Sequence, residues 1–184
     1  MSSDPHALPP DLPVPEDDGA ARGLPGRELP ALLLEATAGG AVDLRDAARD
    51  LLVLYVYPRT GAPPIEGWDE IPGARGCTPE NCAFRDHARD LGELGATVHG
   101  LSSQPLEEQR AFAEREGIPY ALLNDSALQL ATDPGLPTFE AGRQRLYRRL
   151  TLIARAGTIE HVFYPVFPPD AHAGEVVGWL RAAA

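Results

Sequence analysis

The chain has 184 residues, 43% of them hydrophobic, and a formal net charge of −11. These values are typical of one globular domain, and the negative charge argues against binding to nucleic acid or to anionic membranes. No apolar run approaches the ~20 residues of a membrane-spanning helix, and residues 1–15 lack the pattern of a secretory signal. We therefore expect a cytoplasmic protein.

The first 22 residues are rich in Pro, Asp, Ser and Ala and show no hydrophobic periodicity. Such a segment does not bury enough apolar surface to order itself. We predict a flexible N-terminal tail over residues 1–22 and a single domain over residues 23–184.

Apolar runs and helical periodicity then alternate along the chain. Strands are predicted over residues 32–37, 51–57, 96–101, 120–123, 150–154 and 158–164, and helices over 44–48, 77–94, 105–116, 126–131 and 171–181. From residue 51 onward the alternation predicts a parallel sheet with right-handed crossovers, and the last two strands form a hairpin at an antiparallel edge. The fold class is α/β: a thioredoxin-like fold with a central mixed sheet flanked by helices.

The two cysteines of the chain, Cys77 and Cys82, lie five residues apart after a loop rich in Gly and Pro. The helix begins either after Thr78 as its N-cap or near Gly76, with Cys77 in its first turn. Free amide groups and the dipole at a helix N-terminus favour the reactive thiolate. A second thiol nearby traps an oxidised sulfur as a disulfide, so this pattern indicates redox chemistry.

Two other readings of the cysteine pair remain open at this point. Both residues could simply be small buried hydrophobes. A metal site formed by Cys77, Cys82 and His87 offers three ligands and no second cysteine pair, so no metal and no other cofactor is expected.

Five segments, in order, resemble the peroxiredoxins, and most closely the Q-type (bacterioferritin-comigratory) branch. They are residues 51–58 (Leu-Leu-Val-Leu-Tyr-Val-Tyr-Pro), 76–86 (Gly-Cys-Thr-Pro-Glu-Asn-Cys-Ala-Phe-Arg-Asp), 98–102 (Val-His-Gly-Leu-Ser), 119–125 (Pro-Tyr-Ala-Leu-Leu-Asn-Asp) and 149–153 (Arg-Leu-Thr-Leu-Ile), the last followed by 157–159 (Gly-Thr-Ile). The resemblance covers roughly residues 30–180.

The resemblance implies a thiol peroxidase that reduces hydrogen peroxide or organic hydroperoxides. Cys77 matches the peroxidatic cysteine, Cys82 the resolving cysteine that forms an intramolecular disulfide, and Arg149 the arginine that stabilises the thiolate and orients peroxide. The implied reductant is thioredoxin or a similar dithiol protein, and the implied assembly is a monomer or dimer.

The loop before Cys77 departs from the family pattern. Family members carry a Pro and then a Thr or Ser three residues before the peroxidatic cysteine, but here Pro58 is followed by an insertion and position 74 is Ala. Pro58 and Thr60 are therefore the expected substrate-binding residues, with Thr60 folding back to supply the hydroxyl. This departure keeps an alternative function open: a redox sensor or dithiol binding module on the same fold.

The surroundings of the cysteines carry further expectations. Glu80, at the helix start, is predicted to be a solvated carboxylate, with acceptance from backbone amides or from an arginine as the alternative. Packing roles are predicted for Trp68 and Trp179, with Trp68 able to cover the active site. Residues five apart in an α-helix have Cα atoms ~8.7 Å apart, whereas a disulfide needs less than roughly 7 Å. The first turns of the helix must therefore unwind before Cys77 and Cys82 can bond.

Overall fold

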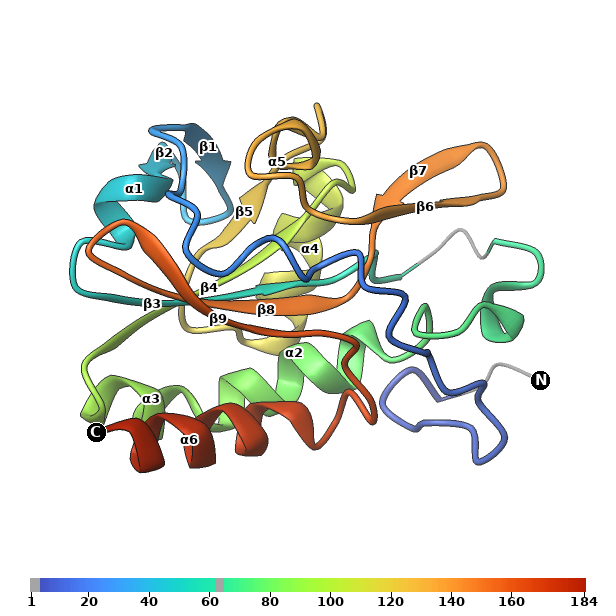
Figure 1. Ribbon diagram of the computed structural model, residues 1–184. Coiled ribbons are helices and arrows are strands. Elements are labelled where there is room, and N and C mark those ends of the chain that lie inside the picture. Colours follow the sequence, from blue (N-terminus) through green and yellow to red (C-terminus); the bar gives the residue numbers. More distant parts are fainter. Residues whose placement is uncertain (1–3, 62–64) are drawn as a thin grey trace.

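A computed structural model describes residues 4–61 and 65–184 and places a seven-stranded mixed sheet at the centre of the molecule (Figure 1). The order in the sheet is β2-β1-β5-β4-β3-β8-β9. Its strands are β1 (Leu33–Ala36), β2 (Ala41–Asp43), β3 (Leu51–Val56), β4 (Ala96–Ser102), β5 (Leu122–Asn124), β8 (Leu150–Arg155) and β9 (Thr158–Phe163). A separate hairpin pairs β6 (Thr138–Ala141) with β7 (Gln144–Tyr147).

Helices cover the sheet, and three of them, α2, α3 and α6, lie together on one side of it in Figure 1. The helices are α1 (Leu44–Ala47), α2 (Cys77–Asp86), α3 (Ala88–Glu93), α4 (Leu106–Glu116), α5 (Gln129–Thr132) and α6 (His172–Ala183), and a 3-10 turn, η1, spans Trp68–Glu70. None of the helices in the described ranges is long and apolar enough to cross a membrane.

Strand β3 organises the core because it is buried on both faces along its whole length. It pairs in parallel with β4 and antiparallel with β8. Alternate residues of a strand point to opposite faces, so Val53 and Tyr55 pack with Phe84 of α2, while Leu52 and Leu54 pack in a second cluster on the other face. The apolar run at 51–57 thus forms the central strand that its sequence predicts.

The predicted α/β, thioredoxin-like class with a central mixed sheet is confirmed, and three details differ from prediction. The helix expected over 77–94 is divided at His87 into α2 and α3. The hairpin β8–β9 contributes β8 to the interior of the sheet, next to β3, and only β9 is an edge. Strand β2 and the β6–β7 hairpin were not predicted, because neither has a clear alternation of apolar residues.

Residues 4–22, predicted to be a flexible tail, lie against the domain and contact it along their length (Figure 1). Leu8 lies close to Gly76, at the start of α2. Farther along, the Tyr164 hydroxyl donates a hydrogen bond to Asp18 (2.8 Å), and Ala21 is buried in the core. The apolar residues that make such contacts, Leu8 and Ala21, are far apart and follow no helical or strand period, so hydrophobic periodicity does not reveal them.

Candidate active site

The position of Cys77 is set by a sharp turn at Gly76, which is the N-cap residue of α2. Gly76 has φ = 108°, a conformation that side chains rarely adopt. A Cβ at this position would also lie 2.3 Å from Cγ of Pro169. The helix therefore begins at Cys77, so the reading with Cys77 in the first turn is right and the reading with Thr78 as the N-cap is wrong.

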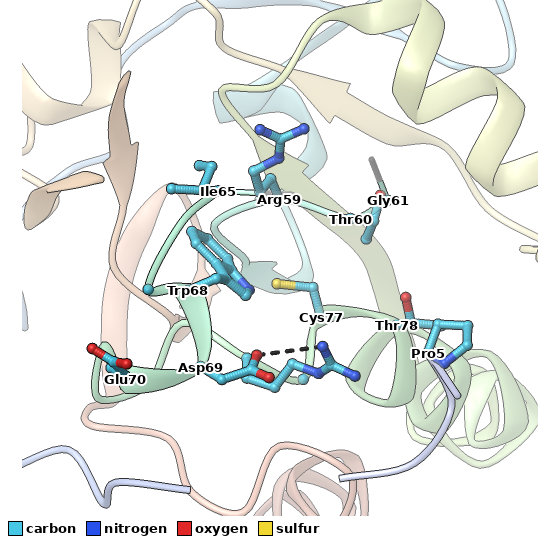
Figure 2. Close-up of a pocket in the computed structure, with 13 residues that line it drawn as sticks. Pro5, Arg59, Thr60, Gly61, Ile65, Trp68, Asp69, Glu70, Cys77 and Thr78 are labelled. Carbon is cyan, nitrogen blue, oxygen red and sulfur yellow. Dashed lines mark hydrogen bonds and ion pairs between the residues drawn. The ribbon is translucent and has the colours of Figure 1, made fainter. Parts of the chain in front are cut away.

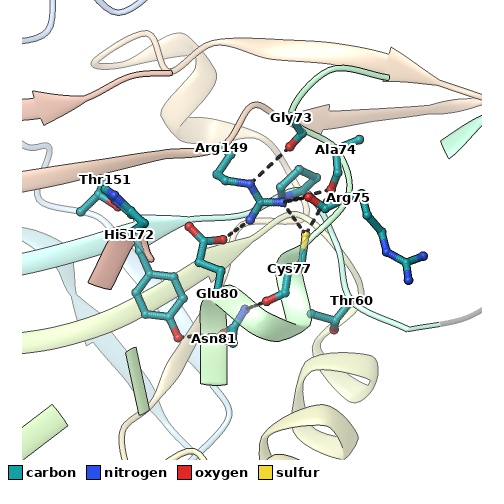
Figure 3. Close-up of polar contacts among 12 residues, drawn as sticks. Thr60, Gly73, Ala74, Arg75, Cys77, Glu80, Asn81, Arg149, Thr151 and His172 are labelled. Carbon is teal, nitrogen blue, oxygen red and sulfur yellow. Dashed lines mark hydrogen bonds and ion pairs between the residues drawn. The ribbon is translucent and has the colours of Figure 1, made fainter. Parts of the chain in front are cut away.

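The Cys77 thiol faces a buried guanidinium. Nη2 of Arg149 lies 3.2 Å from Sγ, and the thiol also lies 3.6 Å from the carbonyl oxygen of Ala74 (Figure 3). Only 4% of Cys77 is exposed. The structure thus brings together two of the predicted site residues, which are 72 positions apart in the chain.

Arg149 also binds the loop that leads to Cys77, in addition to the Cys77 sulfur. Nε donates to the carbonyl of Gly73 (3.3 Å), and Nη2 donates to the carbonyls of Ala74 (3.0 Å) and Arg75 (3.2 Å). Nη1 donates to the carboxylate of Glu80. The planar fork of donors that is peculiar to arginine makes all these bonds from one side chain. Arg149 is therefore a buried residue of the site and not a surface arginine.

Glu80 is buried and ion-paired with Arg149, so the expectation of a solvated carboxylate is wrong. Its position three residues after Cys77 puts both side chains on the same face of α2. Among the described residues, its second oxygen, Oε1, has no hydrogen-bond partner. Burial raises the pKa of Glu80 to about 7, although the Arg149 charge works in the opposite direction.

Two charges of opposite sign act on the thiol, besides its burial. Burial is the largest influence and raises the pKa of Cys77, whereas the Arg149 charge lowers it and the Glu80 charge raises it. Hydrogen bonding from the backbone of Arg59 also lowers it. The thiolate therefore depends on Arg149, and it forms more readily when Glu80 is protonated.

The first turn of α2 is fastened to the core by a buried hydrogen-bond chain. The amide of Asn81 donates to the carbonyl of Cys77 (2.8 Å), and the Tyr55 hydroxyl donates to Asn81 (2.7 Å). The Tyr55 ring stacks on Phe84, with ring centroids 4.2 Å apart. These contacts fix Cys77 relative to the central strand.

A pocket of about 490 Å³ opens in front of Cys77 and is lined by residues of the insertion (Figure 2). Thr60 and Trp68 both line it. The Thr60 hydroxyl donates to Oε1 of Gln104 (3.2 Å), from a position on the same pocket wall. Pro58 is buried, and its carbonyl accepts from Ser102 (2.9 Å); it does not line this pocket, and its contact with substrate stays a prediction.

Cys82 lies in the same helix as Cys77 but faces elsewhere. Five residues turn an α-helix through about 140°, and Cys82 contacts His6 and Glu116 and not the pocket. Both cysteines are free thiols. The geometry keeps them apart while α2 is intact, as the spacing predicts.

A thioredoxin-like sheet that carries a thiol at a helix start, beside a buried arginine, defines a thiol oxidoreductase of the redoxin class. The redoxin family model matches residues 24–177. The chain is 32% identical over 162 residues to the chloroplast peroxiredoxin Q of Arabidopsis thaliana, covering 86% of this chain and 67% of that one. The chloroplast peroxiredoxin Q of Gentiana triflora is 29% identical over 180 residues, covering 95% and 77%.

Solved structures agree with these relatives. The peroxidoxin BcpB of Mycobacterium tuberculosis superposes with a TM-score of 0.71 and 27% identity, covering 88% of this chain and 98% of that one. A peroxiredoxin Q of Xanthomonas campestris, 24% identical with a TM-score of 0.69, has the same fold over 86% and 98% of the two chains. The chain therefore belongs to the redoxin family, within its peroxiredoxin Q branch, and is a thiol-dependent peroxidase.

For Glu80 the sequence favoured the wrong reading, because the pairing with an arginine was only the alternative to a solvated carboxylate. Its spacing of three from Cys77 is visible in the sequence and places it on the same helix face. Its partner, Arg149, lies 69 positions away in the chain, just before β8. The spacing of Cys77 and Glu80 could be seen in the sequence, but only the structure shows that Arg149 contacts both side chains.

Proposed function

We propose that Cys77 is the peroxidatic cysteine. Its thiolate attacks the terminal oxygen of a hydroperoxide and breaks the O–O bond; sulfur is oxidised to a sulfenic acid, while the peroxide is reduced and leaves as water or an alcohol after taking a proton. The observation that carries this assignment is the 3.2 Å contact between Arg149 and Sγ at the end of the pocket. A fixed positive charge there stabilises both the thiolate and the charge that develops on the leaving oxygen.

Thr60 and Arg149 are proposed to orient the peroxide. The Thr60 hydroxyl lies on the pocket wall. Three residues before Cys77, where the family motif has a hydroxyl residue, this chain has Ala74. Its bond to Gln104 holds the side chain in place. Thr60 is thus proposed to supply the hydroxyl that position 74 lacks.

Cys82 is proposed to resolve the sulfenic acid. Its thiol attacks the Cys77 sulfur, water leaves, and an intramolecular disulfide forms. Because both residues belong to α2, the first turns of this helix unwind in that step. A thioredoxin-type dithiol then reduces the disulfide by thiol–disulfide exchange. The proposed location of the reaction is the cytoplasm, and the proposed assembly is a monomer or dimer.

The experiment that tests these roles follows oxidation of the reduced protein by stoichiometric hydrogen peroxide, with intact mass recorded for wild type, Cys77→Ser and Cys82→Ser. Fast disulfide formation is expected in wild type, no fast oxidation in Cys77→Ser, and arrest at sulfenic acid in Cys82→Ser. Oxidation of wild type no faster than that of a free thiol would contradict the assignment and would favour a slow redox sensor.

A further inference from the structure

The side chain of Cys82, the proposed resolving cysteine, lies in a cluster with two other possible metal ligands. His6, Cys82 and Glu116 come from the N-terminal segment, from α2 and from the end of α4, and each offers one donor atom within 4.8 Å of the others. Sγ of Cys82 lies 3.9 Å from Nδ1 of His6 and 3.7 Å from Oε2 of Glu116. The same carboxylate oxygen lies 3.6 Å from Nε2 of His6.

These spacings are close to those that a tetrahedral zinc ion requires. With zinc–ligand distances of about 2.0–2.3 Å, neighbouring donors around the ion are about 3.3–3.6 Å apart. The two distances to His6 involve different ring nitrogens, so the imidazole must turn or shift to present a single nitrogen to the ion together with Sγ and Oε2. Before any such shift, one donor atom from each residue already lies within 4.8 Å of the others. Thiolate, imidazole and carboxylate are all zinc ligands, and a three-ligand site leaves the fourth position to water.

The surroundings hold the ligands in position. Oε1 of Glu116 accepts a hydrogen bond from Arg115 (2.9 Å), which leaves Oε2 turned toward Cys82. Nη1 of Arg85 donates to the main-chain carbonyl of Glu116 (2.7 Å). Partners of this kind orient metal ligands. The Glu116 side chain is 7% exposed and His6 is 52% exposed, so an ion can enter from the His6 side.

The N-terminal segment brings His6 to this place through contacts of its own. The backbone N–H of His6 donates to the carboxylate of Asp4 (2.9 Å), and Leu8 packs close to Gly76. Figure 2 shows Pro5 beside Thr78, at the start of α2. The N-terminal segment thus already packs against the start of α2, the helix that carries Cys82.

We propose that His6, Cys82 and Glu116 form a binding site for a thiophilic divalent cation, with zinc as the fitting ion. Binding forms the metal–sulfur bond and releases the Cys82 proton to solvent, with no change of oxidation state. An ion at this site ties the N-terminal segment to α2 and occupies the sulfur that would otherwise attack Cys77. The effect on turnover depends on the proposed function, whereas metal binding does not.

The test uses the full, reduced, metal-free chain titrated with Co²⁺, whose thiolate charge-transfer band reports sulfur ligation, and with Zn²⁺ in competition with a chromogenic chelator. One equivalent is expected to bind. Cys82→Ser should abolish the Co²⁺ band, and His6→Ala and Glu116→Gln should each weaken binding at least about tenfold. Since His6 is half exposed, its replacement leaves the fold intact.

Two controls separate this site from the alternatives. Cys77→Ser should bind the metal as wild type does, although it lacks the peroxidatic thiol, so a failure of the proposed enzyme mechanism cannot be mistaken for a failure of the site. His87→Ala should also have no effect, because its imidazole contacts Asp90 instead (3.0 Å). Loss of binding in either control, or unchanged binding in His6→Ala and Glu116→Gln, would overturn the proposal.

The functional consequence has its own readout. With zinc bound, wild type treated with stoichiometric hydrogen peroxide should accumulate the Cys77 sulfenic acid, detected by a sulfenic-acid reagent and intact mass, and His6→Ala should form the disulfide as it does without zinc. Disulfide formation at the same rate with and without bound zinc in wild type would show that the ion does not block Cys82.

Discussion

At the scale of single residues, the site is organised by one guanidinium. Arg149 contacts the Cys77 sulfur, the Glu80 carboxylate and the carbonyls of Gly73, Ala74 and Arg75. It therefore both shapes the loop that leads to Cys77 and supplies the charge that favours the thiolate. A side chain with a single charged nitrogen does not make these contacts together.

Replacement of Arg149 tests this dual role. Arg149→Lys keeps the charge but loses the fork, and we expect the second-order rate of Cys77 oxidation by peroxide to fall roughly tenfold to hundredfold; Arg149→Ala should lower it by roughly 10²–10³ and raise the Cys77 pKa. Stopped-flow fluorescence and the pH dependence of thiol alkylation measure both. Arg148→Lys, at the neighbouring surface position, is the control, and an unchanged rate and pKa in Arg149→Ala would retire the role.

Glu80 predicts a pH dependence of stability. Its pKa is raised from 4.5 to about 7 in the folded protein, so the folded state holds a proton that the unfolded state releases. The resulting stabilisation is complete below pH ~4.5 and is lost as pH rises through ~7, a change of up to about 3 kcal/mol. Relative to Glu80→Gln, which does not titrate, the parent should lose free energy of unfolding over this range.

Urea unfolding at several pH values measures this difference, in a Cys77→Ser background that removes the neighbouring thiol titration. A parent and a Glu80→Gln variant whose free energies of unfolding change in parallel from pH 4.5 to 8 would contradict the raised pKa.

At the scale of elements, α2 carries both cysteines and is fastened to the core at its first turn. Asn81 and Tyr55 anchor its start, while the Cys77 and Cys82 side chains lie about 140° apart around its axis. Since a disulfide cannot span the intact helix, oxidation and helix structure oppose each other. In the proposed resolution step, part of the free energy of disulfide formation is therefore expected to be used to unwind α2.

Amide hydrogen exchange measures this coupling. In the oxidised protein, the amides of residues 77–84 should exchange at least about tenfold faster than in the reduced protein, with a small loss of helical circular dichroism, because local opening replaces helical hydrogen bonds. The central strand β3 should keep its protection and serves as the internal control. Near-identical exchange of α2 in the two forms would rule out unwinding.

The turn into α2 depends on a glycine for two physical reasons, its positive φ and the closeness of Pro169. Gly76→Ala should therefore destabilise the protein by about 1–3 kcal/mol and slow Cys77 oxidation. Gly178, in α6, is the matched control, because a Cβ there meets no atom within 4 Å and its φ is not positive.

Gly178→Ala should instead stabilise the protein by about 0.5–1 kcal/mol, the usual gain for an open helical position. Thermal or urea unfolding of the two variants gives the comparison, and equal effects of the same sign would show that the Gly76 geometry does not matter.

At the scale of the whole molecule, the N-terminal segment and the described residues of the insertion both border the site. Pro5 and Trp68 both line the pocket, and His6 lies against Cys82. These two segments thus contribute side chains to the surroundings of both cysteines. The sheet and its helices supply the fixed frame behind them.

Deletion of residues 2–9 tests the contribution of the N-terminal segment. In a Cys77→Ser background, where Cys82 is the remaining thiol, its alkylation should become several-fold faster because a side chain that is 9% exposed loses its cover. The free energy of unfolding should change little, since these residues add little to the apolar core. Equal alkylation rates in the two chains would show that the segment does not shield Cys82.

The sequence by itself determined the frame of the fold and the family, and it supplied the candidate reacting residues. The run at 51–57 is apolar throughout, as expected of a strand that is buried on both faces. The motifs around Cys77, Cys82 and Arg149 identified the family. The tertiary structure decided what depends on contacts between distant positions: the burial of Glu80 against Arg149, Thr60 on the pocket wall, β8 in the sheet interior, and His6 beside Cys82. Local patterns encode helices, strands and motifs, whereas the partner of a buried charge or thiol is set by the packing of segments far apart in the chain.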